Sequence, residues 1–192
     1  YGKELAQRIL EGLKDLNFPD VNFRIDFQRT DRYSGNGWDA VEFLISTNPG
    51  EPVKPLAKVV SGGELSRIML AIKALLADRD DTETLIFDEI DTGISGRTAQ
   101  KVSEKMAAIG RNRQVICITH LAQIAAMADE HFEIRKEVEN QETSTKIRRL
   151  SAKESVEELA RILGGAEITH AVYENAKEMK ELAAQQKSSR LK

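Results

Sequence analysis

The chain has 192 residues, of which 41% are hydrophobic and 31% charged, a composition typical of globular domains rather than of disordered chains. Because 28 Lys and Arg stand against 31 Asp and Glu, the net charge of −3 excludes a chain-wide electrostatic attraction to nucleic acid or anionic membranes. One cysteine, Cys117, excludes an internal disulfide and a multi-cysteine metal site, and no apolar run approaches the roughly 20 residues of a membrane span.

The N-terminal part predicts a helix followed by a two-stranded hairpin. Apolar residues at helical spacing predict an amphipathic helix over residues 3–16. Alternation of apolar and polar residues predicts a strand over 21–27, and a second strand is expected at about 40–47. Between them, the polar and Gly-rich residues 30–38 predict a loop, and three prolines make residues 48–58 an irregular linker.

From residue 63 the pattern alternates between helix and strand. An apolar stripe predicts a helix to about residue 78, and a second helix is expected to end near Ile109. Two short runs without polar alternation, 84–87 and 115–118, predict parallel strands covered on both faces. Because strand–helix–strand units cross over right-handedly, both strands should end at the same edge of the sheet.

The C-terminal part predicts a hairpin and two helices. Runs at 131–138 and 144–150 flank a turn at 140–142. Ser151 and Glu154 form a capping box that opens a helix ending at Gly164-Gly165. A last helix is expected over about 167–184, followed by a polar tail that frays.

Two acidic residues and one histidine follow the predicted parallel strands. Asp88 and Glu89 come directly after the first strand, at the edge where open α/β sheets bind ligands. One carboxylate can hold Mg²⁺ while its neighbour positions or deprotonates a water, although two acids can also simply begin a loop. His120 follows the second strand, 31 residues after Glu89, so the same edge is expected to carry an imidazole able to donate to a phosphate oxygen. Spacing alone leaves an ordinary strand-end histidine equally open.

The segment SGGELSR at 61–67 opens the first helix of this part. Ser61 and Glu64 occupy capping-box positions. Gly62 and Gly63 between them cost about 1 kcal/mol each relative to Ala in a helical turn. Since a helix N-terminus binds anions through its free N–H groups, a phosphate contact explains the glycine pair better than capping alone.

In this order, these elements resemble the ABC-type ATPase superfamily. SGGE at 61–64 resembles its signature motif, TLIFDE at 84–89 its Walker B strand, residues 90–96 its D-loop, and Thr119-His120 its switch histidine. VSGGELSR, IFDEIDTGISG and ITHLAQIAAMAD resemble most closely the SMC-like proteins of bacterial DNA double-strand-break repair, over about residues 49–165. The resemblance implies an α/β fold, the C-terminal lobe of an ABC/SMC-type P-loop ATPase head, with parallel strands flanked by helices and an N-terminal β-hairpin region.

The resemblance also implies a dimer of heads that sandwiches two ATP molecules with Mg²⁺. Each expected role belongs to a matching position. Ser61, Gly62 and Gly63 would contact the γ-phosphate in trans, with Glu64 in the same nucleotide-binding motif. Asp88 would be the Mg²⁺ ligand, Glu89 the catalytic base, Asp91 a nucleotide-binding residue at the dimer seam, and His120 the γ-phosphate sensor. The expected partners are a second head and DNA, without a membrane, in the bacterial cytoplasm at the nucleoid.

One departure from the superfamily is decisive. No G-x-x-x-x-G-K-[ST] occurs, and the only Gly-Lys pair, Gly2-Lys3, lacks the loop that cradles phosphates. We therefore expect a fragment that begins at Tyr1, needs a separate N-terminal P-loop half, and neither binds nor hydrolyses ATP well alone. The expected divisions are residues 1–18 (end of a coiled coil or first head helix), 19–165 (head) and 166–192 (C-terminal helix and tail).

Two other functions stay open. A transporter ATPase subunit shares the fold but matches residues 90–96 less well, and a catalytically silent interaction module would keep the acids and His120 without using them. Aromatic and basic residues near the first hairpin turn can stack on nucleic acid, but a solvated turn suits the balanced charge better; they are Arg29, Arg32, Tyr33 and Trp38. Cys117, inside an apolar run, is expected in the core rather than as a nucleophile.

Overall fold

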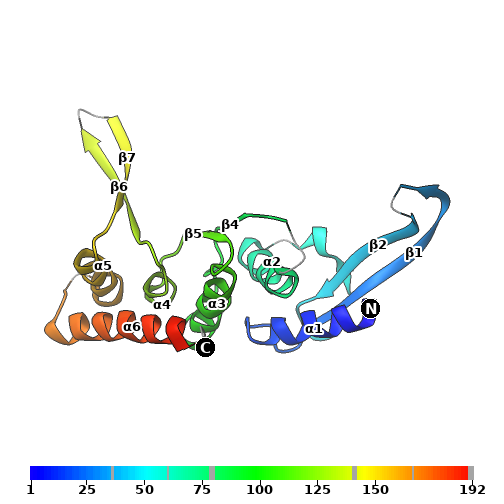
Figure 1. The fold of residues 1–192 in the computed structure, drawn as a ribbon, viewed down its shortest axis with the longest axis horizontal. Helices are drawn as coiled ribbons and strands as arrows, with labels where there is room; N and C mark the ends of the chain where they lie inside the picture. The colour runs from blue at the N-terminus through cyan, green and yellow to red at the C-terminus, as the bar shows by residue number, and fades with distance from the viewer. Residues whose placement is uncertain (36, 60, 78–80, 140–141, 166, 190–192) are drawn as a thin grey trace. The chain divides into compact units, whose positions relative to one another are not determined.

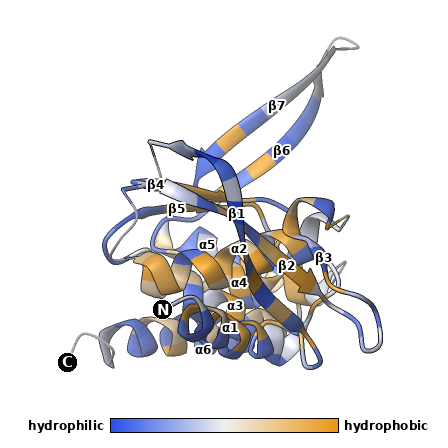
Figure 2. Cartoon of the chain, turned by 90° about the vertical axis from the view of Figure 1, so that its right-hand side faces the viewer, coloured by the Kyte–Doolittle hydropathy of each residue, from blue (hydrophilic) through white to orange (hydrophobic). Residues whose placement is uncertain are grey.

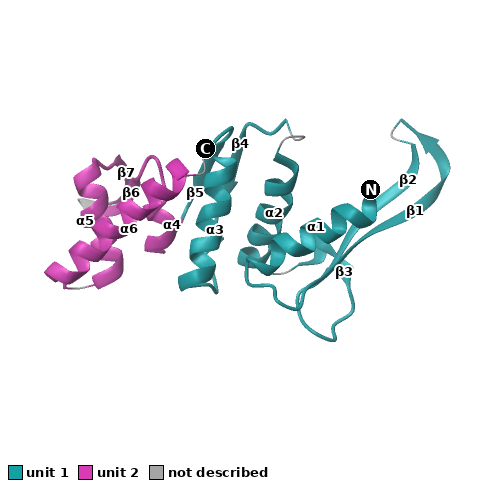
Figure 3. Ribbon diagram, turned by 60° about the horizontal axis from the view of Figure 1, so that its bottom comes forward, with its two compact units in different colours: residues 1–118 teal, residues 119–192 magenta. Residues whose placement is uncertain are grey.

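The computed structural model describes residues 1–35, 37–59, 61–77, 81–139, 142–165 and 167–189 (Figure 1). Within these ranges the chain forms two compact units, Tyr1–Ile118 and Thr119–Lys192 (Figure 3). The domain divisions expected from the sequence remain predictions.

The first unit begins with a helix packed on a hairpin. Helix α1 (Gly2–Lys14) buries Ile9 and Leu13, and strands β1 (Asn22–Ser34) and β2 (Gly37–Ser46) pair antiparallel. A two-residue strand, β3 (Lys54–Pro55), adds to β2 and leads into the 3-10 helix η1 (Leu56–Lys58). The tip of the hairpin projects away from α1 (Figure 1).

The loop predicted at 30–38 is wrong for most of its length, because β1 continues to Ser34 and β2 begins at Gly37. Side chains across the two strands hold this extension. The Thr30 hydroxyl donates to the Trp38 carbonyl at 2.8 Å, the rings of Tyr33 and Trp38 meet edge to face at 5.5 Å, and the Arg29 guanidinium lies 5.1 Å from the Trp38 ring centre. Such cross-strand pairs stabilise a hairpin despite its polar composition.

The rest of the first unit is a strand–helix–strand arrangement with a preceding helix. Helix α2 (Gly62–Leu76), strand β4 (Thr84–Phe87), helix α3 (Gly96–Ile109) and strand β5 (Gln114–Cys117) follow in order. Strands β4 and β5 pair parallel, from Thr84↔Gln114 to Phe87↔Cys117, as predicted.

Coverage of β4 and β5 on both faces was expected, and that expectation is wrong for this chain. Ile86 and Ile116, which pair across the two strands, are 67% and 44% exposed, and Ile118 beyond them is 48% exposed. The neighbouring Phe87 is buried. The pair of strands therefore has one packed face and one exposed apolar face.

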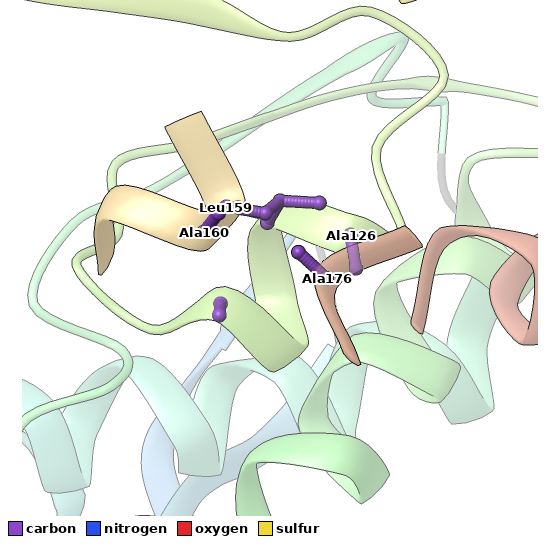
Figure 4. Close-up of a cluster of buried hydrophobic side chains, with 6 residues drawn as sticks. Ala126, Leu159, Ala160 and Ala176 are labelled. Atoms are coloured by element: carbon purple, nitrogen blue, oxygen red, sulfur yellow. The ribbon is translucent and has the colours of Figure 1, made fainter. Parts of the chain in front are cut away.

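The second unit packs helices around small side chains. It contains α4 (Ala122–Ala126), the antiparallel strands β6 (Phe132–Glu139) and β7 (Glu142–Arg149), α5 (Ala152–Gly164) and α6 (His170–Ser189). Its core is a cluster in which alanines allow close helix packing (Figure 4): Ala122, Ala125, Ala126, Leu159, Ala160 and Ala176. Figure 2 shows the β6–β7 hairpin as a largely hydrophilic ribbon with isolated hydrophobic bands.

Two local predictions for this unit have different outcomes. The capping box is confirmed, since the Ser151 hydroxyl accepts the Glu154 N–H and the Glu154 carboxylate accepts the Ser151 N–H. The predicted frayed tail is wrong up to Ser189, because Lys187 in the last turns of α6 donates to the Met127 carbonyl and to Asp129. The centre of the predicted turn, residues 140–141, lies outside the described residues.

No helix in the described part of the chain is both long and apolar enough to cross a lipid bilayer.

Candidate functional site

The acid pair lies directly after β4, in a loop that we define as residues 88–92 and call the acid loop. Asp88 and Glu89 are both exposed. The Asp88 Oδ1 accepts the N–H of Glu89 at 2.9 Å, and the Glu89 carbonyl accepts the N–H of Thr92 at 3.0 Å. Glu89 has a φ of 56°, a left-handed conformation that few non-glycine residues adopt. The acid loop is therefore a tight turn that presents two carboxylates at the carboxyl end of a parallel strand.

The signature-like segment forms the N-terminal turn of α2. Ser61 is the N-cap, and its hydroxyl accepts the N–H of Glu64 at 3.4 Å. Ser61 and Gly62 are exposed, while Gly63 is buried. The exposed part of this turn combines a hydroxyl with the positive end of a helix, which is the chemistry of an anion site.

The α2 N-terminal turn packs directly against the acid loop, which the sequence analysis did not anticipate. A Cβ atom at Gly62 would collide with a carboxylate oxygen of Glu89. One at Gly63 would lie 2.9 Å from the Glu89 carbonyl oxygen, 2.9 Å from the Thr92 Cβ and 3.1 Å from the Thr92 carbonyl oxygen. Gly63 thus has an intramolecular cause that requires no phosphate, because the acid loop backbone approaches it closely, whereas Gly62 faces only the end of the Glu89 side chain. The phosphate contact stays a prediction.

Two further side chains of α2 hold the acid loop. The Ser66 hydroxyl donates to the Asp88 carbonyl at 2.8 Å. Arg67, only 4% exposed, donates through Nη1 to the carbonyls of Ile90 at 3.2 Å and Thr92 at 2.7 Å. Burial lowers the pKa of the Arg67 guanidinium, and the nearby charge of Glu64 partly opposes this shift. The structure therefore brings together the predicted residues of 61–64 with those of 88–91, and adds Ser66 and Arg67.

The remaining predicted residues have different surroundings. Asp91 is 3% exposed, so its side chain is buried rather than on the surface. Burial first, then the negative charges of Asp91 and Asp88, raise the pKa of the Cys117 thiol to about 12. A thiol with this pKa is protonated at neutral pH, which argues against a nucleophile. Cys117 is only partly buried, so the expectation that it lies in the core is met in part.

His120 belongs to the second unit and is exposed at the entrance to α4. Just before α4, the Thr119 hydroxyl accepts the N–H of Leu121 at 3.0 Å. The predicted convergence of His120 on the acid pair joins residues of two units and remains a prediction.

The acid pair is compatible with a magnesium ion that is also held by phosphates. Among the described residues, no group of three or more His, Cys, Asp or Glu side chains is arranged to hold a metal ion. Mg²⁺ in phosphate-transfer sites typically takes only one or two carboxylates and completes its shell with phosphates and water. Asp88 and Glu89 fit that donor set.

Comparisons with known proteins identify relatives over nearly the whole chain. No protein-family model matches the sequence. The DNA repair protein RecN of Halalkalibacterium halodurans is 48% identical over 184 residues, covering 94% of this chain and 33% of that protein. RecN of Bacillus subtilis is 43% identical over 204 residues (98% and 35%), and RecN of Vibrio cholerae 43% over 180 (93% and 32%). The chain spans about a third of the length of these relatives and matches their C-terminal part.

Solved structures support the predicted fold. An Smc head domain with a coiled coil and joint from Pyrococcus yayanosii is 21% identical, covers 82% of this chain and 28% of that chain, and has a TM-score of 0.56. An Smc head domain with an extended coiled coil from Pyrococcus furiosus is 20% identical, with coverages of 84% and 38% and a TM-score of 0.54. The prediction of a C-terminal lobe of an ABC/SMC-type head is confirmed.

Proposed function

Because this chain is a homologue of the C-terminal part of RecN-family DNA repair proteins, we propose that it is the second half of an SMC-like ATPase head that dimerises on ATP and acts in DNA double-strand-break repair. The observation that carries the proposal is the placement of two motifs on one fold. SGGE opens an α-helix with Ser61 and Gly62 exposed, and the exposed acid pair ends a parallel strand. Both motifs are accessible to a ligand.

The residues would divide the work of ATP hydrolysis. Ser61, Gly62 and Gly63, at the N-terminal turn of α2, would contact the γ-phosphate of a nucleotide held by a second head, with Glu64 in the same motif. Asp88 would hold Mg²⁺, which supplies charge neutralisation at the phosphates. Glu89 would position the attacking water and accept its proton.

Two further residues complete the proposed site. His120 would donate to the γ-phosphate. Asp91 is buried, so its proposed contribution at the dimer seam is to fix the shape of the acid loop that meets the other head.

A P-loop half is the proposed partner for the exposed face of β4 and β5. Ile86, Ile116 and Ile118 form one contiguous apolar face beside the acid pair. The relatives are about three times as long as this chain. We propose that the segment that covers this face and cradles the phosphates belongs to the part of such a protein outside the matched region. Because the relatives are DNA repair proteins, the proposal also includes DNA as a partner and a cytoplasmic location at the nucleoid.

The rival functions make different predictions. The DNA repair names of the relatives favour repair over transport. A silent interaction module would keep the fold but would not need a carboxylate at position 89.

Calorimetry tests the half-head proposal. Without a P-loop, this chain lacks the backbone N–H groups and the lysine that bind the β- and γ-phosphates, so we expect no ATP binding at micromolar concentrations. Adding the N-terminal half of the relatives' head region should restore binding. Micromolar affinity of this chain alone would contradict the proposal.

A further inference from the structure

Arg67 is a buried cation whose hydrogen bonds, among the residues that the structure describes, go to backbone carbonyls. Its Nη1 donates to the Ile90 and Thr92 carbonyls, and its guanidinium lies 5.5 Å from the ring centre of Phe18. Its Nε is buried and has no hydrogen-bond partner among the residues that the structure describes.

A side chain of this kind is costly if its only purpose is packing. Desolvating a guanidinium is unfavourable, and an unmet buried N–H adds to the penalty. An apolar side chain of similar length would fill the space between α2 and Phe18 without either cost. An apolar residue could not replace the hydrogen bonds that Arg67 donates to the carbonyls of the acid loop.

The acid loop needs such donors because of its shape. Glu89 is in a left-handed conformation, which is strained for a non-glycine residue and persists only where the surroundings enforce it. From α2, Ser66 donates to the Asp88 carbonyl and Arg67 donates to the Ile90 and Thr92 carbonyls. Gly63 leaves room for the Glu89 carbonyl to approach α2 closely. Arg67 supplies the two hydrogen bonds from α2 to the residues that follow Glu89, Ile90 and Thr92.

We propose that Arg67 is a positioning residue for hydrolysis, which locks the acid loop to α2 so that Glu89 and the phosphate-binding turn at Ser61–Gly63 move as one body. The proposal rests on the proposed function and deepens it. In an ATP-bound dimer, a phosphate contact at the α2 N-terminal turn would thereby fix the general base of the same chain. Arg67 contacts the backbone of the acid loop and acts through Glu89.

The kinetic test uses Arg67→Met and Arg67→Lys in the head reconstituted with its P-loop half. Arg67→Met should lower kcat by about 100-fold, the effect typical of misplacing a catalytic group by about 1 Å. ATP affinity and the ATP-dependent dimer should stay within about 3-fold of wild type, since Ser61 and Asp88 are untouched. Arg67→Lys retains a donor near the same carbonyls and should recover part of kcat. Arg111→Met, at an exposed arginine, is the control.

Two kinetic outcomes would overturn the proposal. One is a kcat within about 2-fold of wild type in Arg67→Met. The other is a parallel loss of kcat, dimerisation and thermal stability, which would make Arg67 merely structural.

Hydrogen exchange provides a readout that needs no ATP. In this 192-residue chain, the Thr92 amide, which donates to the Glu89 carbonyl, should exchange at least about 10-fold faster in Arg67→Met, while amides in the centre of α3 keep their rates. Unchanged exchange at Thr92 would refute the positioning role. A wild-type reconstituted head that fails to hydrolyse ATP would refute the proposed function instead, and the exchange experiment would still decide the role of Arg67.

Discussion

Replacing Gly63 with alanine tests the close approach of α2 to the acid loop. The added Cβ would lie 2.9 Å from the Glu89 carbonyl oxygen and 2.9 Å from the Thr92 Cβ, where contacts of 3.4–4 Å are ordinary. Ser66 and Arg67 hydrogen-bond to the backbone of the acid loop. The loop therefore cannot move aside freely to make room for the added Cβ. Overpacking of this kind costs about 1–3 kcal/mol, and the gain in helix propensity returns at most about 1 kcal/mol.

We therefore expect a net loss of about 1–2 kcal/mol in the free energy of unfolding, or roughly 2–8 °C in Tm for a chain of this size. Urea and thermal unfolding measure it. Gly12→Ala is the matched control, because it lies inside α1 and its Cβ would meet only the Ala71 Cβ at 3.7 Å. It should stabilise the chain by about 0.5–1 kcal/mol. A Gly63→Ala chain as stable as wild type would refute the packing argument.

Three further predictions concern single residues. Ser61→Arg should block ATP-dependent dimerisation of the reconstituted head by filling the space before α2, whereas Ser61→Ala should cost only the cap, about 1 kcal/mol; light scattering with ATP distinguishes them, and an undiminished dimer in Ser61→Arg would leave only the capping role. Asp88→Asn should weaken nucleotide affinity and hydrolysis together, because the metal loses its anchor; retained affinity, measured by calorimetry, would contradict this assignment. Hydrogen bonds with the Ser151 side chain and backbone, and then with Arg148, lower the pKa of Glu154 from 4.5 to about 2; this stabilisation is complete above pH 4.5 and is lost as the pH falls towards 2, so acid should destabilise wild type more than Glu154→Gln in thermal unfolding, and equal acid sensitivity would contradict it.

Local patterns were sufficient to predict most of the elements. The capping box at Ser151 depends on residues three positions apart, which the sequence shows directly. The parallel pairing of β4 and β5 follows from two apolar runs joined by a helical pattern. The extension of the first hairpin could not be predicted in this way. Its stability comes from Arg29 and Tyr33 on one strand meeting Trp38 on the other, whereas composition alone indicates a polar loop.

The site was predictable as motifs but not as a set of contacts. SGGE and the acid pair were identified because their chemistry is unusual at a helix start and at a strand end. Arg67 was missed because its partners, Ile90 and Thr92, lie 23 and 25 residues away, and no local period marks such a contact. The exposed face of β4 and β5 was also mispredicted, since an apolar run indicates that a strand face can be buried but not which segment covers it.

Steady-state ATP hydrolysis by the reconstituted head, with wild-type chain and with Glu89→Gln, tests the central claim most directly. The amide keeps the size of the side chain and its hydrogen bond to water but cannot accept the proton, and loss of a general base typically costs about 10²–10⁴-fold in rate. We predict hydrolysis by the wild-type head, that loss in kcat for Glu89→Gln, and an ATP-bound dimer that persists or lengthens its lifetime. Turnover by Glu89→Gln near the wild-type rate, or no hydrolysis by the wild-type head, would contradict the account.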